Sequence, residues 1–415
     1  MKQSRLVLVS TAISFAAALS LVLAGCSSTS SSDSNSGGSM SGASSTSAPS
    51  PDSSGGGTGF VETTRNRLDS EFVLGPSAAD AMGYRVAWNR RAINTSSLEV
   101  LKAAIAGDSL FVIDDKNNLT RILLSDGRQV WTWPVAGTTD NILGVARARY
   151  GDTDLVVVAT EGDVHLFEVN NGIQTDRQRL ERVSSTAPVV YGQSIIYGSI
   201  NGTLVWHHFL MGAFLRGYTM NGAILVDPVI ENDVVVAVTD RGQVMAVDAS
   251  SGRQLWSNYA RDAILSTPAI GEKAVYTTSV DQYIRCYDIR SGRVLWSRLH
   301  EEPLRQPPVL IGDRVFVQTP DLGLCCYEAL PFQDLDGELI WNTKEVTGTI
   351  IGRHRNRVLA WDADARTLAV VDDRTGNIVE TISLPTVTSL KLSAFDSGDI
   401  YAISETGEIT RAVAR

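Results

Sequence analysis

Short apolar runs separated by turn residues fill the chain from residue 84 onward. One representative block reads "STPAIGE", "AVYTTSV", "QYIRCYDI" and "SGRVLW" in order. Such runs, rich in β-branched and aromatic residues, are typical of hairpin strands. Almost no stretch in this region shows the apolar period of roughly 3.6 residues that a helix requires, so repeating helix pairs are excluded.

The block recurs along the chain at a nearly constant interval. A glycine before the fourth run of each block serves as a register mark, and successive marks are 39 to 45 residues apart. Four residues after the mark lies a tryptophan in the strong copies, whereas the weak copies have Asp176, Arg216 and Glu380. The marks are Gly127, Gly172, Gly212, Gly252, Gly292, Gly337 and Gly376, and the tryptophans are Trp131, Trp256, Trp296 and Trp341, with Trp88 fitting the series at the front.

Four strands per roughly 40–45 residues is the period of a β-propeller blade. The eight register positions therefore predict an all-β, eight-bladed β-propeller with four-stranded antiparallel blades over residues 84–415, with seven blades as the alternative. The last block ends at Arg415 without a fourth strand. We expect the strand from Tyr84 to Asn89 to supply it, because pairing the two termini removes free sheet edges.

The recurrent glycines and tryptophans predict how neighbouring blades join. A large ring on the outer strand of one blade can lie across a turn of the next blade. Only glycine allows the backbone to approach a ring face so closely. We therefore predict blade-docking roles for Trp88, Trp131, Trp256, Trp296, Trp341, Gly127, Gly252, Gly292 and Gly337.

The first 83 residues do not follow the repeat. Lys2 and Arg5 precede an apolar run that ends in "LAGC", which predicts a secretory signal over residues 1–25. An uncleaved transmembrane anchor is the alternative. Residues 26–59 are rich in serine and glycine and predict a flexible tether, and residues 60–83 form a short extension. Within that extension we expect one helical turn that begins with Ser77 as its N-cap.

The phrases "AVDASSGRQLW" and "CYDIRSGRVLW" resemble the quinoprotein (PQQ-type) propeller repeat, and the resemblance covers residues 84–415. "LAGC" resembles a bacterial lipobox, which implies a lipid on Cys26, and by the same resemblance Ser27 implies the outer membrane. Together these features are similar to the BamB-type lipoproteins of the outer-membrane β-barrel assembly machine.

That resemblance implies a non-enzymatic scaffold in the cell envelope, anchored by lipid and facing the periplasm. Its partners would be other envelope or outer-membrane proteins, and it would act as a monomer within a complex. Two alternatives stay open: a dehydrogenase of alcohols or sugars that uses PQQ and Ca²⁺, or a ligand-sensing propeller. The sensing alternative would need an aromatic cluster at one rim, for which Trp133, Trp206 and Trp361 are the candidates.

Net charge and cysteine count narrow the possible partners and sites. A net charge of −10 disfavours nucleic acid as a partner. Cys286, Cys325 and Cys326 are an odd set and thus no disulfide framework. We expect structural thiols, with a vicinal Cys325–Cys326 disulfide as the alternative. In PQQ enzymes, which this repeat resembles, such a pair often lies against the cofactor.

No catalytic, cofactor-binding or metal-binding residue is predicted. His207 and His208 are adjacent on a strand and point to opposite faces, so they cannot converge on one ion. The acids lack the calcium-loop spacing and are assigned to turns. These acids are Asp114, Asp115, Asp362, Asp364, Asp372 and Asp373. Two basic clusters, at residues 177–182 and 352–357, could contact an acidic partner or lipid headgroups.

Overall fold

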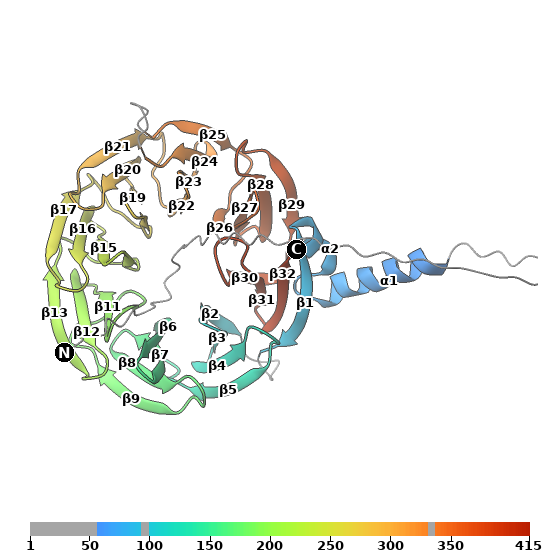
Figure 1. The fold of residues 1–415 in the computed structure, drawn as a ribbon, viewed down its shortest axis with the longest axis horizontal. Coiled ribbons are helices and arrows are strands. Elements are labelled where there is room, and N and C mark those ends of the chain that lie inside the picture. Colours follow the sequence, from blue (N-terminus) through green and yellow to red (C-terminus); the bar gives the residue numbers. More distant parts are fainter. Residues whose placement is uncertain (1–55, 93–98, 331–336) are drawn as a thin grey trace, which may run out of the picture.

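The structure is a computed structural model that describes residues 56–92, 99–330 and 337–415, with side chains from residue 64 onward. Eight four-stranded antiparallel sheets stand around a central axis (Figure 1). The predicted eight-bladed propeller is confirmed, and the seven-bladed alternative is wrong.

Each blade takes four consecutive strands, except the last. Blade 1 is β2 (Val100–Ala106), β3 (Ser109–Asp114), β4 (Asn118–Leu123) and β5 (Gln129–Pro134); blade 2 is β6 (Ile142–Tyr150), β7 (Thr153–Thr160), β8 (Asp163–Glu168) and β9 (Gln174–Arg179). Blade 3 is β10 (Val189–Tyr191), β11 (Ser194–Gly198), β12 (Thr203–His208) and β13 (Ala213–Thr219); blade 4 is β14 (Val229–Glu231), β15 (Val234–Val238), β16 (Gln243–Asp248) and β17 (Gln254–Tyr259).

The second half of the ring repeats this plan. Blade 5 is β18 (Ala269–Ile270), β19 (Ala274–Thr278), β20 (Tyr283–Asp288) and β21 (Val294–Leu299); blade 6 is β22 (Val309–Ile311), β23 (Arg314–Thr319), β24 (Gly323–Glu328) and β25 (Leu339–Thr343). Blade 7 is β26 (Thr349–His354), β27 (Arg357–Asp362), β28 (Thr367–Asp372) and β29 (Ile378–Ser383); blade 8 is β30 (Val387–Leu392), β31 (Ile400–Ser404), β32 (Glu408–Ala414) and β1 (Tyr84–Arg91).

The N-terminal strand closes the ring as predicted. β1 pairs with β32, and Tyr84 lies opposite Ala414 in an antiparallel register. The sheet order of blade 8 is therefore β1-β32-β31-β30, so both ends of the propeller are held in one sheet. This closure leaves no blade with a free edge at the seam.

The core lies between neighbouring blades rather than in one central mass. In β15 every residue is buried, because both faces of this middle strand contact another sheet. Tyr287 and Ile289 of blade 5 pack with Val234 and Val236 of blade 4 in one cluster. The outer strand β17 differs from β15, since Trp256 is its one buried residue.

Two helices precede the ring: α2 (Pro76–Ala81) confirms the predicted helical turn, whereas α1 (Gly56–Glu71) was not predicted. α1 begins inside the range predicted as a tether, and α2 follows it. The prediction that Ser77 is the N-cap is wrong, because Gly75 takes that position with extended backbone. The Ser77 hydroxyl donates instead to the Asp69 carboxylate, at 2.5 Å.

No helix in the described ranges has the length and apolar character to cross a membrane. The predicted signal, the alternative transmembrane anchor and Cys26 all lie outside the described residues.

Candidate functional site at the blade junctions

The predicted docking residues meet at the junctions between blades. At the junction of blades 4 and 5, the Trp256 ring N–H donates to the Ile289 carbonyl at 2.8 Å. The backbone of Gly292 lies against the ring face, so that a Cβ there would be 2.6 Å from Cδ2 of Trp256. Gly292 has φ of +70°, in the left-handed region that glycine adopts without strain.

The same contact recurs at four other junctions. In each, a buried tryptophan on the outer strand donates its N–H to the carbonyl that follows the third strand of the next blade. The pairs are Trp88 with Leu124 (3.3 Å), Trp131 with Val169 (2.8 Å), Trp296 with Ala329 (2.9 Å) and Trp341 with Asp373 (3.1 Å). Trp88 belongs to β1, so this contact also joins blade 8 to blade 1.

A second docking position lies two residues after the tryptophan, and sequence reasoning missed it. Its side chain bonds to a carbonyl in the glycine turn of the next blade. The pairs are Trp133 with Asn171 (3.2 Å), Asn258 with Gly292 (2.5 Å), Arg298 with Gly337 (2.9 Å) and Thr343 with Gly376 (2.5 Å). Because the residue type varies, no repeated letter marks this position in the sequence.

The junction of blades 3 and 4 uses a different donor. Arg216 stands in the tryptophan column, which is the position four residues after each register glycine. Its side chain lies against Gly252. The N–H to the Ala249 carbonyl comes instead from Trp206 on the third strand, at 3.3 Å. The docking partner of Gly252 is therefore an arginine stem, while a tryptophan from another strand makes the hydrogen bond.

The junction of blades 2 and 3 has no tryptophan at all. Asp176 stands in the column and is exposed. Two residues on, the buried Gln178 amide donates to the Phe209 carbonyl at 2.5 Å and its oxygen contacts His207 at 2.8 Å. A cavity of about 510 Å³ remains beside Asp176.

The junction of blades 7 and 8 is filled from outside the repeat. Glu380 stands in the tryptophan column and is exposed. Leu74, Ala79 and Met82 of the N-terminal extension are fully buried in one cluster with Ile382 of β29. The extension therefore supplies the apolar contact that the weak repeat lacks.

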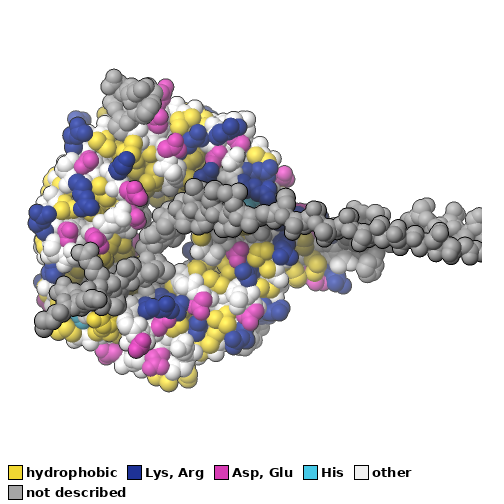
Figure 2. Space-filling view, in the orientation of Figure 1, with side chains coloured by type: hydrophobic (Ala, Val, Ile, Leu, Met, Phe, Trp, Pro, Cys, Tyr) yellow, Lys and Arg dark blue, Asp and Glu magenta, His cyan; other side chains and the backbone are white. Residues whose placement is uncertain are grey.

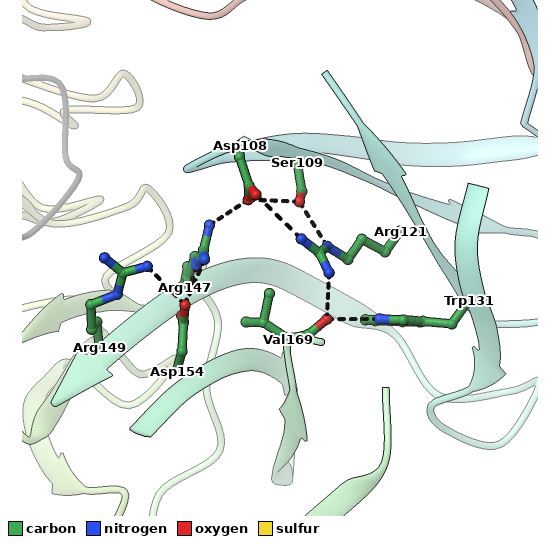
Figure 3. Close-up of polar contacts among 8 residues, drawn as sticks. All are labelled: Asp108, Ser109, Arg121, Trp131, Arg147, Arg149, Asp154 and Val169. Carbon is green, nitrogen blue, oxygen red and sulfur yellow. Dashed lines mark hydrogen bonds and ion pairs between the residues drawn. The ribbon is translucent and has the colours of Figure 1, made fainter. Parts of the chain in front are cut away.

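A charged network reinforces the junction of blades 1 and 2 (Figure 3). Arg121 is buried and donates to the Val169 carbonyl that also accepts from Trp131. Arg147 bridges Asp108 at 2.7 Å and Asp154 at 2.6 Å. Burial alone would raise the pKa of Asp154, but the hydrogen bonds and charge of Arg147 outweigh burial and lower it. These groups are paired with one another, which suits a structural role.

The central opening of the ring is visible in Figure 2, and a cavity of about 490 Å³ lies among the inner strands β2, β6 and β30. Its charged lining residues are Lys102, Asp227 and Lys391. Desolvation raises the pKa of Asp227, although the Ala187 N–H and the charge of Lys102 oppose the shift. Desolvation likewise lowers the pKa of Lys391.

This channel does not fit a quinone cofactor held by Ca²⁺. Calcium takes roughly six to eight oxygen ligands, drawn from carboxylates, carbonyls and water. The cavity offers one carboxylate, Asp227, which already accepts the Ala187 N–H at 2.7 Å. Across the described ranges, no group of three or more His, Cys, Asp or Glu side chains is placed to hold a metal ion.

Comparison with known proteins places the chain in a family. Residues 192–414 match the sequence profile of the family described as outer membrane protein assembly factor BamB, which is more than half of the 415 residues. The chain belongs to the BamB family.

Solved structures share the fold of this BamB-family chain at low sequence identity. The crystal structure of BamB from Moraxella catarrhalis is 17% identical, with a TM-score of 0.62 over 80% of this chain and 97% of the other. The computationally designed Ika8 protein is 16% identical, with a TM-score of 0.61 over 77% and 98%. No curated protein matches the sequence. At these identities the structural matches show the propeller fold alone.

The adjacent cysteines of this BamB-family propeller point away from each other. Cys325 packs in the cluster of Trp296 and Cys326 in the cluster of Trp341, and both thiols are free. Burial raises the pKa of Cys326 to about 12 and raises that of Cys325. A vicinal disulfide would need its two sulfurs about 2.05 Å apart, so β24 would have to leave its regular alternation.

The histidines and turn acids have structural partners. His208 accepts the Met211 N–H at 3.2 Å, as Asp248 in the same column accepts the Ser251 N–H at 2.8 Å. His207 points to the opposite face and is buried. Asp114, Asp362 and Asp372 each accept backbone N–H groups of their own turns.

The remaining candidates do not converge on a site. Trp133, Trp206 and Trp361 lie on blades 1, 3 and 7, and two of the three are buried, so they form no aromatic cluster at one rim. In the basic clusters, Arg177 pairs with Asp163 at 2.9 Å and Arg353 with Asp373 at 3.0 Å.

Proposed function

We propose that this propeller is a non-catalytic scaffold that binds other proteins of the cell envelope. One observation carries the proposal: an exposed apolar patch on blade 3, formed by Leu210, Met211, Phe214 and Leu215. Their exposed fractions are 41%, 71%, 37% and 43%. Large apolar side chains that gather on an exposed surface are typical of a protein-interaction site.

Membrane attachment is the second part of the proposal. The "LAGC" sequence supports lipidation of Cys26, and the serine-rich stretch that follows it supports a tether. A lipid chain with a long tether would keep the propeller near the membrane while its rims stay accessible. The family description, an outer membrane protein assembly factor, supports a role in the assembly of outer-membrane proteins.

Site-specific photocrosslinking in native membranes tests the scaffold proposal. A photoreactive residue replaces Phe214, and the control replaces Val294, which stands in the same column of blade 5 and is 47% exposed. We expect discrete adducts with envelope proteins at position 214 and none at position 294. An absence of adducts at position 214, or the same adducts at both positions, would contradict the proposal.

Two further measurements test the remaining parts. Cys26→Ala should abolish palmitate incorporation and release the protein from the membrane fraction.

Calorimetric titration with PQQ and Ca²⁺ should give no saturable heat, whereas saturable binding would favour the dehydrogenase alternative.

A further inference from the structure

The cavity between blades 2 and 3 lies beside Asp176, which stands at the position that Trp256 takes in blade 4. Asp176 pairs with Leu166 as Trp256 pairs with Ala246. On the neighbouring strand, Leu155 stands opposite Glu168 as Val234 stands opposite Asp248. Blades 2 and 4 therefore share one strand register at these positions.

The walls of the cavity match the walls around a docked tryptophan ring. Val234, Ala246 and Ile289 surround Trp256 in its cluster. Leu155, Leu166 and Phe209 line the cavity at the corresponding positions, and each is at least 95% buried. Since Asp176 carries no ring, the slot is left open to solvent beside an exposed side chain, and Thr153, Asn170 and Thr175 add polar groups to its lining.

The slot is also acidic at its entrance. Asp152, Glu168 and Asp176 line it, and the described residues offer none of these three a salt-bridge partner. Asp154, the fourth acid, is already paired with Arg147 and with Arg149 at 2.9 Å. The entrance therefore favours a positively charged partner.

We infer that this slot, named here the blade 2–3 slot, binds an aromatic side chain that a partner protein inserts between the blades. The partner segment would carry that side chain, tryptophan by analogy with the filled junctions, between lysine or arginine residues. Leu210 joins the slot to the exposed patch on blade 3, so one segment can contact both. The cavity volume of about 510 Å³ falls within the roughly 300–1,000 Å³ range of ligand pockets. This inference deepens the proposed scaffold function and rests on it.

The test uses the detergent-solubilised full chain and a fluorescent hexapeptide with one tryptophan between two lysines. We expect saturable binding by fluorescence anisotropy. A matched peptide with alanine for tryptophan, or with glutamates for the lysines, should bind at least about tenfold more weakly, a difference of roughly 1.4 kcal/mol.

Asp176→Trp is the decisive variant because it refills the slot from within. We expect it to weaken peptide binding at least about tenfold. Glu380→Trp places the same residue in the same column at the junction of blades 7 and 8, and it should leave binding unchanged. Asp176→Asn, which keeps the slot open and removes one charge, should weaken binding two- to threefold, roughly, and reduce its salt dependence.

The outcomes separate the slot from the scaffold function. Equal binding by wild type and Asp176→Trp, or no binding at millimolar peptide, overturns the slot. If Asp176→Trp keeps the adducts at position 214 in membranes, the scaffold function stands without the slot. If the peptide binds in the slot but wild type gives no adducts in membranes, the scaffold function fails and the slot remains a peptide site.

Discussion

The junction between blades 4 and 5 and the junction between blades 2 and 3 share one backbone arrangement but differ in their side chains. At the first, Trp256 is 7% exposed and seals the space between sheets. At the second, Asp176 leaves the space beside it open, while Gln178 makes the hydrogen bond and lies against Gly212. The comparison shows that the ring has two separable roles, filling the slot and donating an N–H.

A strong repeat and a weak repeat therefore carry different information. Strong copies join neighbouring blades through a buried tryptophan. Weak copies lack the tryptophan that packs between two blades. Blade 7 recovers that contact from the N-terminal extension, whereas the described part of the chain leaves the blade 2–3 slot unfilled.

Removal of a docking ring should give the largest effect. We expect Trp256→Ala to lower the free energy of unfolding by about 3–5 kcal/mol, because a cavity replaces a buried ring. Urea denaturation followed by circular dichroism measures the change. Trp133→Ala is the control, since that ring is 47% exposed and should cost less than half as much. Equal losses in both variants would contradict a special role for the buried column.

The docking glycine should give the next largest effect. Gly292→Ala puts a Cβ into the Trp256 ring and forces a left-handed backbone on alanine, so we expect a loss of about 2–4 kcal/mol. Gly312 has a similar φ of +60° with nothing within 4 Å of an added Cβ. Gly312→Ala therefore measures the backbone strain alone. A Gly292→Ala loss no larger than this control would mean that the ring contact is unimportant.

Filling the open slot should stabilise the protein. We expect Asp176→Trp to raise the free energy of unfolding by about 1–2 kcal/mol, because the ring buries apolar surface against Leu155, Leu166 and Phe209. The same urea titration checks this value, with Glu380→Trp as the matched substitution. A loss of stability would show that the slot differs in shape from the filled junctions.

The smallest expected effect concerns the turn that precedes the Trp256 strand. Hydrogen bonds from the Ser251 N–H and from the Ser250 and Ser251 hydroxyls lower the pKa of Asp248 to about 2. A carboxylate whose pKa is lowered by folding stabilises the folded state at pH values above its ordinary pKa of 3.8. That stability is lost as the pH falls through about 2.

Asp248→Asn should therefore be less stable than wild type at neutral pH by under about 1 kcal/mol, since the group is near the surface. The difference should vanish near pH 2. Urea midpoints between pH 2 and 7, roughly, measure it. A difference that stays constant down to the lowest pH would show that the charge of Asp248 is not involved.

The periodic part of the fold could be read from the sequence because each blade repeats the same local requirements. Strands, turns and the tryptophan column obey spacing rules within one block of about 40 residues. The N-terminal helices could not be read in this way. α1 begins with "GGTGFVETT", where glycine and β-branched residues leave no clear apolar period. Ser77 is a residue type that often caps helices, but Gly75 is the N-cap of α2.

The sequence by itself determined the blade architecture, the closure by β1 and the column in which each docking ring stands, because these follow from local periodicity, and it favoured eight blades over seven. Only the tertiary structure decided how the weak junctions are joined. At these junctions the contacts come from positions outside the column: the hydrogen-bond donors Gln178 and Trp206, and the buried apolar residues of the N-terminal extension. Whether a gap between two sheets is filled depends on the side chains of both blades in three dimensions, and no single repeat contains that information.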